Sequence, residues 1–116
     1  MGRLLIAFLL IVTVHAAAQS SKTKGPDCSG SWPTNMAQAT LKSAGLLNNS
    51  EIDFAKTQTS RLASEMIGKD LWHQVYFVTF FKRSGDKIQA IVVHDASSEE
   101  CSMTGVDVYV VSRVLK

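Results

Sequence analysis

The C-terminal stretch from Leu71 to Leu115 constrains the fold more than any other part of this chain of 116 residues. It contains three segments rich in Val, Ile, Phe and Tyr, and two polar segments separate them. The first polar segment is Arg83 to Asp86, and the second extends from Asp95 to Gly105. Strand-favouring residues that are interrupted by turn-forming residues predict a three-stranded antiparallel meander.

The three predicted strands differ in how cleanly apolar and polar residues alternate. Leu71 to Phe81 is apolar at most positions, which predicts either burial on both faces or a central position with one exposed aromatic face. Lys87 to His94 has a similar pattern. Only Val106 to Leu115 alternates valines with polar residues and Tyr109, and this pattern predicts one solvated face.

The N-terminus has the features of an export signal. Arg3 provides a positive charge, Leu4 to Val14 is almost entirely apolar, and Ala16 to Ala18 provides small residues for cleavage. The apolar run is about half of the roughly 20 residues that span a bilayer, which favours a cleaved signal peptide over a retained anchor. We therefore expect residues 1–18 to be removed and the mature chain, without a membrane span, to be periplasmic or secreted.

The remainder of the chain has the size of a single domain. Residues 19–31 are rich in Ser, Gly and Lys and predict a flexible arm, and residues 32–116 form the domain itself. The chain has 12 Lys and Arg against 10 Asp and Glu, and the two signs are mixed along it. This distribution gives no electrostatic support for nucleic-acid binding.

Cys28 and Cys101 are the two cysteines of the chain. In an exported protein, such a pair predicts a disulfide, and two free thiols are the alternative. The bridge would close a loop of about 74 residues, which the chain-entropy model values at roughly 4 kcal/mol.

Two helices are predicted before the strands. The first extends from about Thr34 to Ala44, with Pro33 at its start and Gly45 as its stop signal. The second extends from Ser50, a favourable cap, to Gly68 and has about four turns. Its predicted apolar stripe consists of residues at three- and four-residue spacing: Ile52, Ala55, Thr59, Leu62 and Met66.

The expected fold is therefore an α+β domain, in which two N-terminal helices lie on one face of a three-stranded antiparallel meander (ααβββ) and one disulfide closes it. This order resembles that of small envelope modules such as the outer-membrane assembly lipoprotein family, and that of cystatin-type domains. The resemblance concerns element order alone, so it implies no site residue. Two helices cover one face, which leaves surplus apolar residues on the other for the N-terminal arm or for another protein.

No residue pattern predicts a catalytic site, a metal site or a cofactor. His94, Asp95 and Cys101 are the residue types of a thiol enzyme, but the cysteine is expected in a disulfide and no family signature surrounds it. His73 and His94 lack the ligand number and spacing of a zinc site. We expect His94, at a strand end, to be solvated or to contact a partner.

The sequence favours an exported, non-enzymatic protein-interaction domain, for example an inhibitor, an immunity-type partner or an envelope accessory protein. The expected partner is a protein of the cell envelope or outside the cell, including a second copy of the chain. Aromatic anchors beside a polar rim are typical of interfaces. The candidate contact residues are Trp72, Tyr76, Tyr109, Asp95, Glu99 and Glu100. The polar segment from Asp95 to Gly105 is equally well explained as a plain connection.

A small-ligand binding module is the alternative function. Its pocket would lie between the long second helix and the sheet, and its lining would be Phe54, Met66, Phe77 and Phe80. A filled core at these positions is the simpler interpretation.

Overall fold

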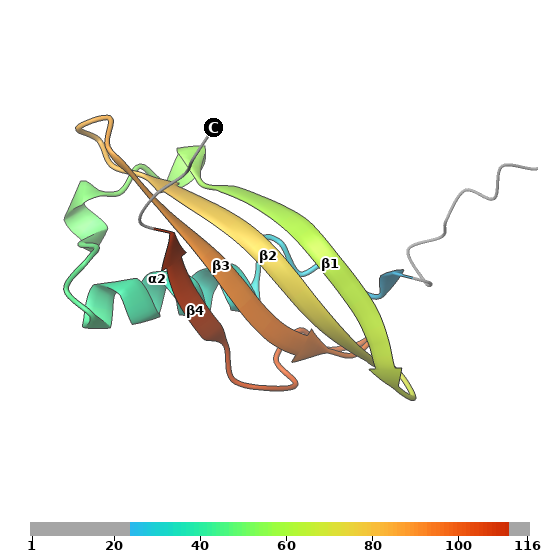
Figure 1. Ribbon diagram of the computed structural model, residues 1–116. Helices are drawn as coiled ribbons and strands as arrows, with labels where there is room; N and C mark the ends of the chain where they lie inside the picture. Colours follow the sequence, from blue (N-terminus) through green and yellow to red (C-terminus); the bar gives the residue numbers. More distant parts are fainter. Residues whose placement is uncertain (1–23, 112–116) are drawn as a thin grey trace, which may run out of the picture.

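The computed structural model describes residues 24–111 (Figure 1). The predicted signal peptide and the last residues of the predicted third strand lie outside this range. Within it, the fold is α+β with one helix of several turns and a four-stranded antiparallel sheet, so the predicted count of two helices and three strands is wrong. The elements are α2 (Trp32–Ser43), the 3-10 turns η1 (Asn49–Glu51) and η2 (Phe54–Lys56), and the strands β1 (Gln58–Gly68), β2 (Leu71–Phe81), β3 (Lys87–Ala96) and β4 (Asp107–Val111).

The strands follow one another in the sheet in chain order, and every neighbouring pair is antiparallel. The meander predicted from Leu71 onward is confirmed in β2, β3 and β4. β2 lies between β1 and β3, which agrees with its nearly continuous apolar sequence. The sheet therefore has two edges, β1 and β4.

The largest difference from prediction is the segment from Ser50 to Gly68, which is not a helix. Its first part forms η1 and η2, and Ile52 is buried there and makes an isolated bridge to Lys82. Its second part is β1, which pairs along β2 through a two-residue turn, Lys69 and Asp70. Pairing satisfies the backbone groups along one edge of β2, and this tertiary contribution outweighs the weak helical preference of the segment.

Two irregularities in β1 explain why its sequence resembles a helix. The register with β2 shifts between Arg61 and Ala63 and again between Met66 and Gly68. Each shift adds a residue to one strand and breaks the alternation of faces. The expected period of two is therefore lost, and the remaining apolar residues appear at helical spacing.

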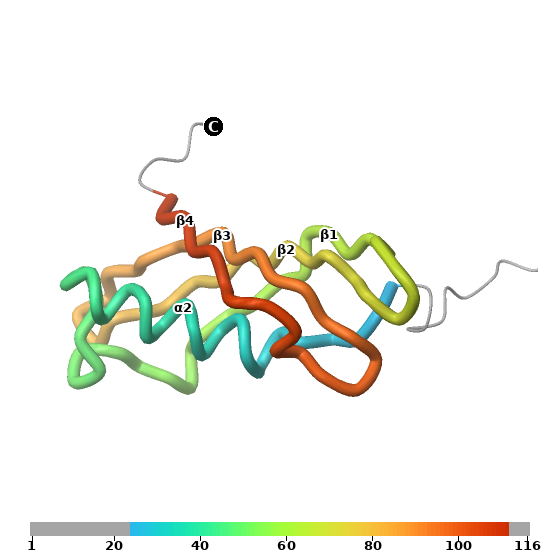
Figure 2. Tube along the Cα trace, turned by 90° about the horizontal axis from the view of Figure 1, so that it is seen from below, coloured from blue at the N-terminus to red at the C-terminus, as the bar shows by residue number. Residues whose placement is uncertain are grey.

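The first predicted helix is confirmed as α2, with bounds one or two residues earlier than expected. Pro33 occupies its first turn, where a missing N–H costs nothing. Gly45, at φ +75°, ends it, and the Leu46 N–H returns to the Leu41 carbonyl. α2 lies against one face of the sheet (Figure 2), where Ala37 and Leu41 are buried in the core.

The predicted disulfide joins Cys28 and Cys101, whose Cα atoms lie 5.8 Å apart. The segment before Cys28 lies on the same face of the sheet as α2. Gly25 there has φ +73°, and a Cβ at this position would lie 2.5 Å from Cγ of Trp72. Only glycine fits between the indole and the backbone, so this part of the arm is a close-fitting cover of the sheet.

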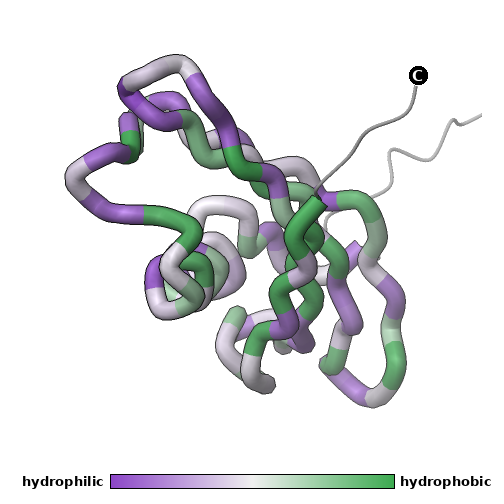
Figure 3. Tube along the Cα trace, turned by 60° about the vertical axis from the view of Figure 1, so that its left-hand side comes forward, coloured by the Kyte–Doolittle hydropathy of each residue, from purple (hydrophilic) through white to green (hydrophobic). Residues whose placement is uncertain are grey.

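The two faces of the sheet differ in what covers them. On β2 and β3, even-numbered residues point to the face that carries α2 and are nearly all buried. Odd-numbered residues point to the opposite face, which we call the open face, because no helix or loop of residues 24–111 lies over it (Figures 1 and 2). Most of its side chains are half-buried. Apolar residues are spread along the strands, with hydrophilic residues between them (Figure 3).

Cross-strand register arranges the open face in rows. The central row contains Ser60, Phe77, Ile91 and Tyr109. The next row toward the β1–β2 turn contains Ala63, Val75, Val93 and Asp107, and the last is the acidic row of Glu65, His73 and Asp95. In the other direction lie Gln58, Thr79, Gln89 and Val111, followed by the Phe81–Lys87 pair.

None of the helices within residues 24–111 combines the length and the apolar composition needed to cross a bilayer.

Candidate functional site

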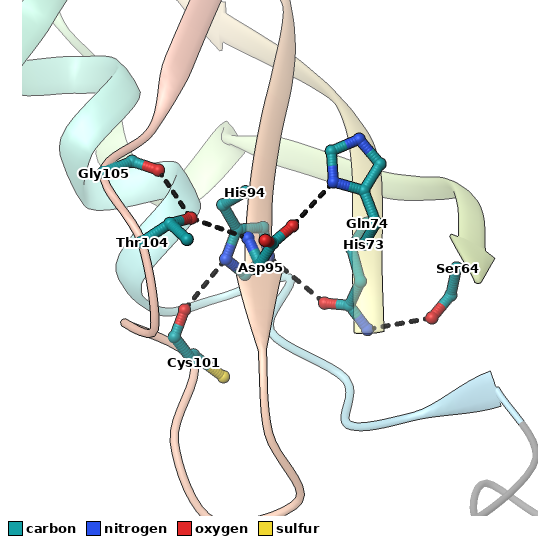
Figure 4. Close-up of polar contacts among 8 residues, drawn as sticks. All are labelled: Ser64, His73, Gln74, His94, Asp95, Cys101, Thr104 and Gly105. Atoms are coloured by element: carbon teal, nitrogen blue, oxygen red, sulfur yellow. Dashed lines mark hydrogen bonds and ion pairs between the residues drawn. The ribbon is translucent and has the colours of Figure 1, made fainter. Parts of the chain in front are cut away.

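Gln74 is the centre of a buried polar network on the core face (Figure 4). Its Nε2 donates to the Pro26 carbonyl at 2.7 Å and to Oγ of Ser64 at 3.1 Å. Because a carbonyl oxygen can only accept, these contacts fix the orientation of the amide. Oε1 of Gln74 therefore faces Tyr76 and His94 as an acceptor.

Tyr76 connects this network to the disulfide. Its hydroxyl accepts a hydrogen bond from the Cys28 N–H at 2.9 Å and donates to Oε1 of Gln74 at 3.0 Å. The side chain is fully buried, and this burial raises the pKa of the Tyr76 hydroxyl. Tyr76 is thus a neutral phenol with both of its hydrogen-bonding roles filled.

His94 connects the network to the other half of the disulfide. Nδ1 lies 2.8 Å from the Cys101 carbonyl, and Nε2 lies 3.2 Å from Oε1 of Gln74. Both partners are acceptors, so we assign the single N–H of the neutral ring to Nδ1, which makes the shorter contact. Burial lowers the pKa of His94, and the Cys101 carbonyl and the Asp95 carboxylate partly oppose this shift.

The network has a structural role in this geometry. It ties Pro26 and Cys28 of the arm and Cys101 of the loop to β2 and β3 through hydrogen bonds that are buried or partly buried. The expectation that His94 is solvated or contacts a partner is wrong, because only 2% of it is exposed. The sulfur of Cys101 is bonded to that of Cys28, so it offers no thiolate beside this histidine.

The opposite side of the same strands carries the acidic row. Nδ1 of His73 lies 2.6 Å from Oδ1 of Asp95, and 46% of the His73 side chain is exposed. Glu65 is the direct neighbour of His73 on β1 and is also exposed. The Asp95 N–H donates to Oγ1 of Thr104 at 2.9 Å, which fixes the backbone beneath the carboxylate. The row therefore places two carboxylates and a histidine at one end of the open face.

The middle of the open face is apolar. Val75, Phe77, Ile91 and Val93 form a block on β2 and β3, and each is half-buried. Tyr109 on β4 extends the block to the edge of the sheet and is 59% exposed. Lys87 lies beyond the block, at the end opposite to the acidic row. The open face is thus an apolar surface with carboxylates at one end and an ammonium group at the other.

The structure separates the predicted contact residues. Trp72 and Tyr76 are 6% and 0% exposed and belong to the core face, so their assignment to a contact surface is wrong. Both point inward because they share the even-numbered face of β2 with Gln74. Tyr109 and Asp95 do lie on the open face. Sequence analysis missed Phe77 and Ile91 as surface residues, although strict alternation from a known inward residue would have identified them.

Glu99 and Glu100 lie in a tight turn after β3, beyond the end of the sheet that carries the acidic row. Oγ of Ser97 accepts hydrogen bonds from the N–H groups of both glutamates. The N–H and Oγ of Ser98 donate to the two carboxylate oxygens of Asp70 at 3.1 and 2.9 Å. The turn is therefore fixed to the β1–β2 connection, and both glutamate side chains remain exposed.

The pocket proposed between a long helix and the sheet does not exist, because that helix is absent. Phe54 and Met66 are 51% and 57% exposed, Phe80 is in the core, and Phe77 lies on the open face, so the four residues do not converge. A hollow of about 430 Å³ lies between the arm and β1. Its lining is largely polar: Lys24, Asp27, Ser29, Thr59, Arg61, Leu62, Ala63 and Ser64.

Between residues 24 and 111 there is no group of three or more His, Cys, Asp or Glu side chains that could hold a metal ion. The distinctive feature of the open face is therefore its apolar block, and not a reactive group. Comparisons of this chain with protein-family models, with curated proteins and with solved structures find no match.

Proposed function

We propose that this chain is an exported, non-enzymatic protein-interaction domain that contacts its partner through the open face. The observation that carries the proposal is the apolar block at the middle of that face, which no helix or loop of residues 24–111 covers. An antiparallel sheet whose second face meets water usually carries polar residues there. Apolar residues on that face instead favour contact with another molecule.

The composition of the open face matches that of a protein interface. Phe77 and Tyr109 provide aromatic surface at its middle, and charged groups lie at its two ends and, as Asp107, at its β4 edge. Interfaces have an apolar, aromatic-rich centre that is depleted of charge and a polar rim that is accessible to water. The geometry thus favours a protein partner over a small ligand, which would require a concave site.

The disulfide supports the export part of the proposal. Cys28 and Cys101 are joined, and such bridges persist in oxidising compartments and are rare in the cytosol. The buried network around Gln74 ends on both halves of this bridge, so the folded core is organised around the oxidised form. This agrees with the apolar N-terminal segment expected to direct secretion.

A capture experiment with matched variants tests the proposal. The exported protein would be immobilised and exposed to an envelope extract and to culture medium from its source. The central variant is Ile91→Lys, which places a charge in the apolar block. The control is Met103→Lys, the same kind of change at a loop residue that is 45% exposed. Thermal unfolding of both variants establishes that they are folded.

We expect the wild type and Met103→Lys to retain the same protein partner and Ile91→Lys to lose it. A partner retained equally by all three would contradict a role of the open face. Recovery of no protein, foreign or identical, would contradict the proposed function as a whole.

A further inference from the structure

We infer that the open face binds a second copy of this chain, face to face, about a two-fold axis along the central row. The inference rests on the proposed function and names its partner. In this arrangement the axis lies in the plane between the sheets and across the strands. β2 and β3 of one copy then lie over β2 and β3 of the other, with opposite chain directions.

The rows of the open face are spaced symmetrically about the central row. Ile91 lies in that row, and Lys87 and Asp95 lie four residues to either side of it on β3. On β2, Phe81 and His73 lie four residues to either side of Phe77. A two-fold axis through the central row therefore places the end row of each copy over the acidic row of the other.

The charges of the two ends are complementary under this operation. Lys87 of each copy faces the row that carries Asp95 of the other, which gives two equivalent ion pairs at the ends of the interface. Packed sheets are rotated by about 30°, which moves the ends sideways by roughly one strand spacing. A sideways shift toward β2 places Lys87 over His73, between Glu65 and Asp95, and a shift toward β4 moves it to the side of Asp95 on which Asp107 lies.

The central row of the interface is apolar on β2 and β3 of both copies. Phe77 and Ile91 meet their own equivalents across the axis. Thr79 and Gln89 of one copy lie over Val75 and Val93 of the other. Nε2 of Gln89 donates to Oγ1 of Thr79 at 3.2 Å, so one hydrogen bond between these two side chains is already formed when they meet an apolar surface.

The size of the face sets the expected affinity. The block from Lys87 to Asp95 is about 26 Å long, and three strand spacings give a width of about 14 Å. These dimensions give about 360 Å² per copy, below the roughly 600 Å² per partner of standard specific interfaces, so we expect the dimer to be weak. Measurements must therefore extend to high protein concentration.

Sedimentation equilibrium of the purified, disulfide-bonded protein up to about 1 mM measures the association directly. We expect a monomer–dimer equilibrium for the wild type and for Met103→Lys. Ile91→Lys brings two like charges together on the axis and should leave only monomer. Lys87→Glu and Asp95→Lys should each weaken dimerisation by about tenfold or more, because each turns two ion pairs into repulsive contacts.

The double variant Lys87→Glu with Asp95→Lys is the decisive measurement. The two positions lie about 26 Å apart within one copy, well beyond the Debye length of about 8 Å at physiological salt. They cannot compensate each other within a chain. Recovery of dimerisation in the double variant would therefore arise only from contacts between copies in the two-fold arrangement.

A wild type that stays monomeric over the whole range would overturn the inference. A dimer that persists in Ile91→Lys would also overturn it, because the association would then use another surface. Failure of the double variant to recover, with its fold confirmed by circular dichroism, would reject the two-fold register. If the wild type is monomeric and Ile91→Lys still loses a foreign partner in the capture experiment, the proposed function stands and only the inference fails.

Discussion

The two faces of the β2–β3 pair present opposite chemistry although they are made from alternating residues of the same strands. Tyr76 faces the core and Phe77 the open face, and His94 and Asp95 divide in the same way. The covered face contains a phenol, an amide and an imidazole, which are joined in one hydrogen-bonded network. The uncovered face contains the apolar block. The core face thus buries a polar network among its apolar residues, and the open face leaves an apolar block only half-buried.

This difference shows that partners, and not polarity alone, decide where a side chain is stable. Buried polar groups are tolerated when each has a hydrogen-bond partner, and the network around Gln74 provides these partners within the chain. The apolar side chains of the open face have no equivalent cover from residues 24–111. The network around Gln74 finds its partners within one copy, whereas the open face is completed by another molecule in our proposal.

Among the changes considered, removal of the disulfide should lower the stability of the core face the most. We expect the double variant Cys28→Ser with Cys101→Ser to lose about 4 kcal/mol of unfolding free energy, because the bridge closes a long loop. Urea unfolding followed by circular dichroism measures the loss. The wild type under reducing conditions should unfold at the same urea concentration as the variant. Unchanged stability would show that the arm is held without the covalent link.

The sequence predicted the parts of this fold that depend on local pattern. β2 and β3 were found from apolar residues and intervening turn residues, and α2 from its stop at Gly45. The disulfide followed from cysteine count and expected compartment. Each of these features is encoded within a short segment or in the composition, so no knowledge of tertiary contacts was required.

β1 and the contact surface could not be predicted because they depend on tertiary pairing. The register shifts in β1 hide its alternation, and only β2 as a neighbour makes it a strand. The sequence of β2 also does not show which of its two sets of alternating residues points to the core, because both sets are largely apolar. Without the positions of α2 and the arm, Trp72 and Tyr76 are as plausible on the surface as Phe77.

Two variants that remove or add one hydroxyl at neighbouring residues, Tyr76→Phe and Phe77→Tyr, test the difference between the faces and have an intermediate expected effect. Tyr76→Phe leaves the Cys28 N–H without its buried acceptor and should cost about 1 to 3 kcal/mol of unfolding free energy. Phe77→Tyr adds a hydroxyl at the half-buried open face, where it can reach water, and should change stability by less than about 0.5 kcal/mol. Urea unfolding of both variants tests this, and equal costs would contradict the assignment of the two faces.

The smallest expected effect is a dependence of stability on pH that originates in His94. Burial lowers the pKa of His94 in the folded protein, whereas the unfolded chain keeps the ordinary histidine pKa of about 6.5. When the pH falls below that value, the unfolded chain therefore binds more protons than the folded protein. The stability that the neutral imidazole provides is complete above that value and decreases toward acid. The decrease from this one residue is at most about 1.4 kcal/mol per pH unit.

His94→Asn isolates this contribution, because the amide nitrogen of asparagine can replace the Nδ1–H donor to the Cys101 carbonyl without titrating in this range. The free energy of unfolding would be measured from pH 7.5 to pH 5 for both proteins, and the slopes compared, since every other titratable group is common to them. We expect a smaller slope in the variant, whatever its absolute stability. Equal slopes of unfolding free energy against pH would mean that the buried imidazole accepts a second proton without a cost in stability. Oε1 of Gln74 would then accept a hydrogen bond from the protonated Nε2. The core face would in that case tolerate a charge as the open face does.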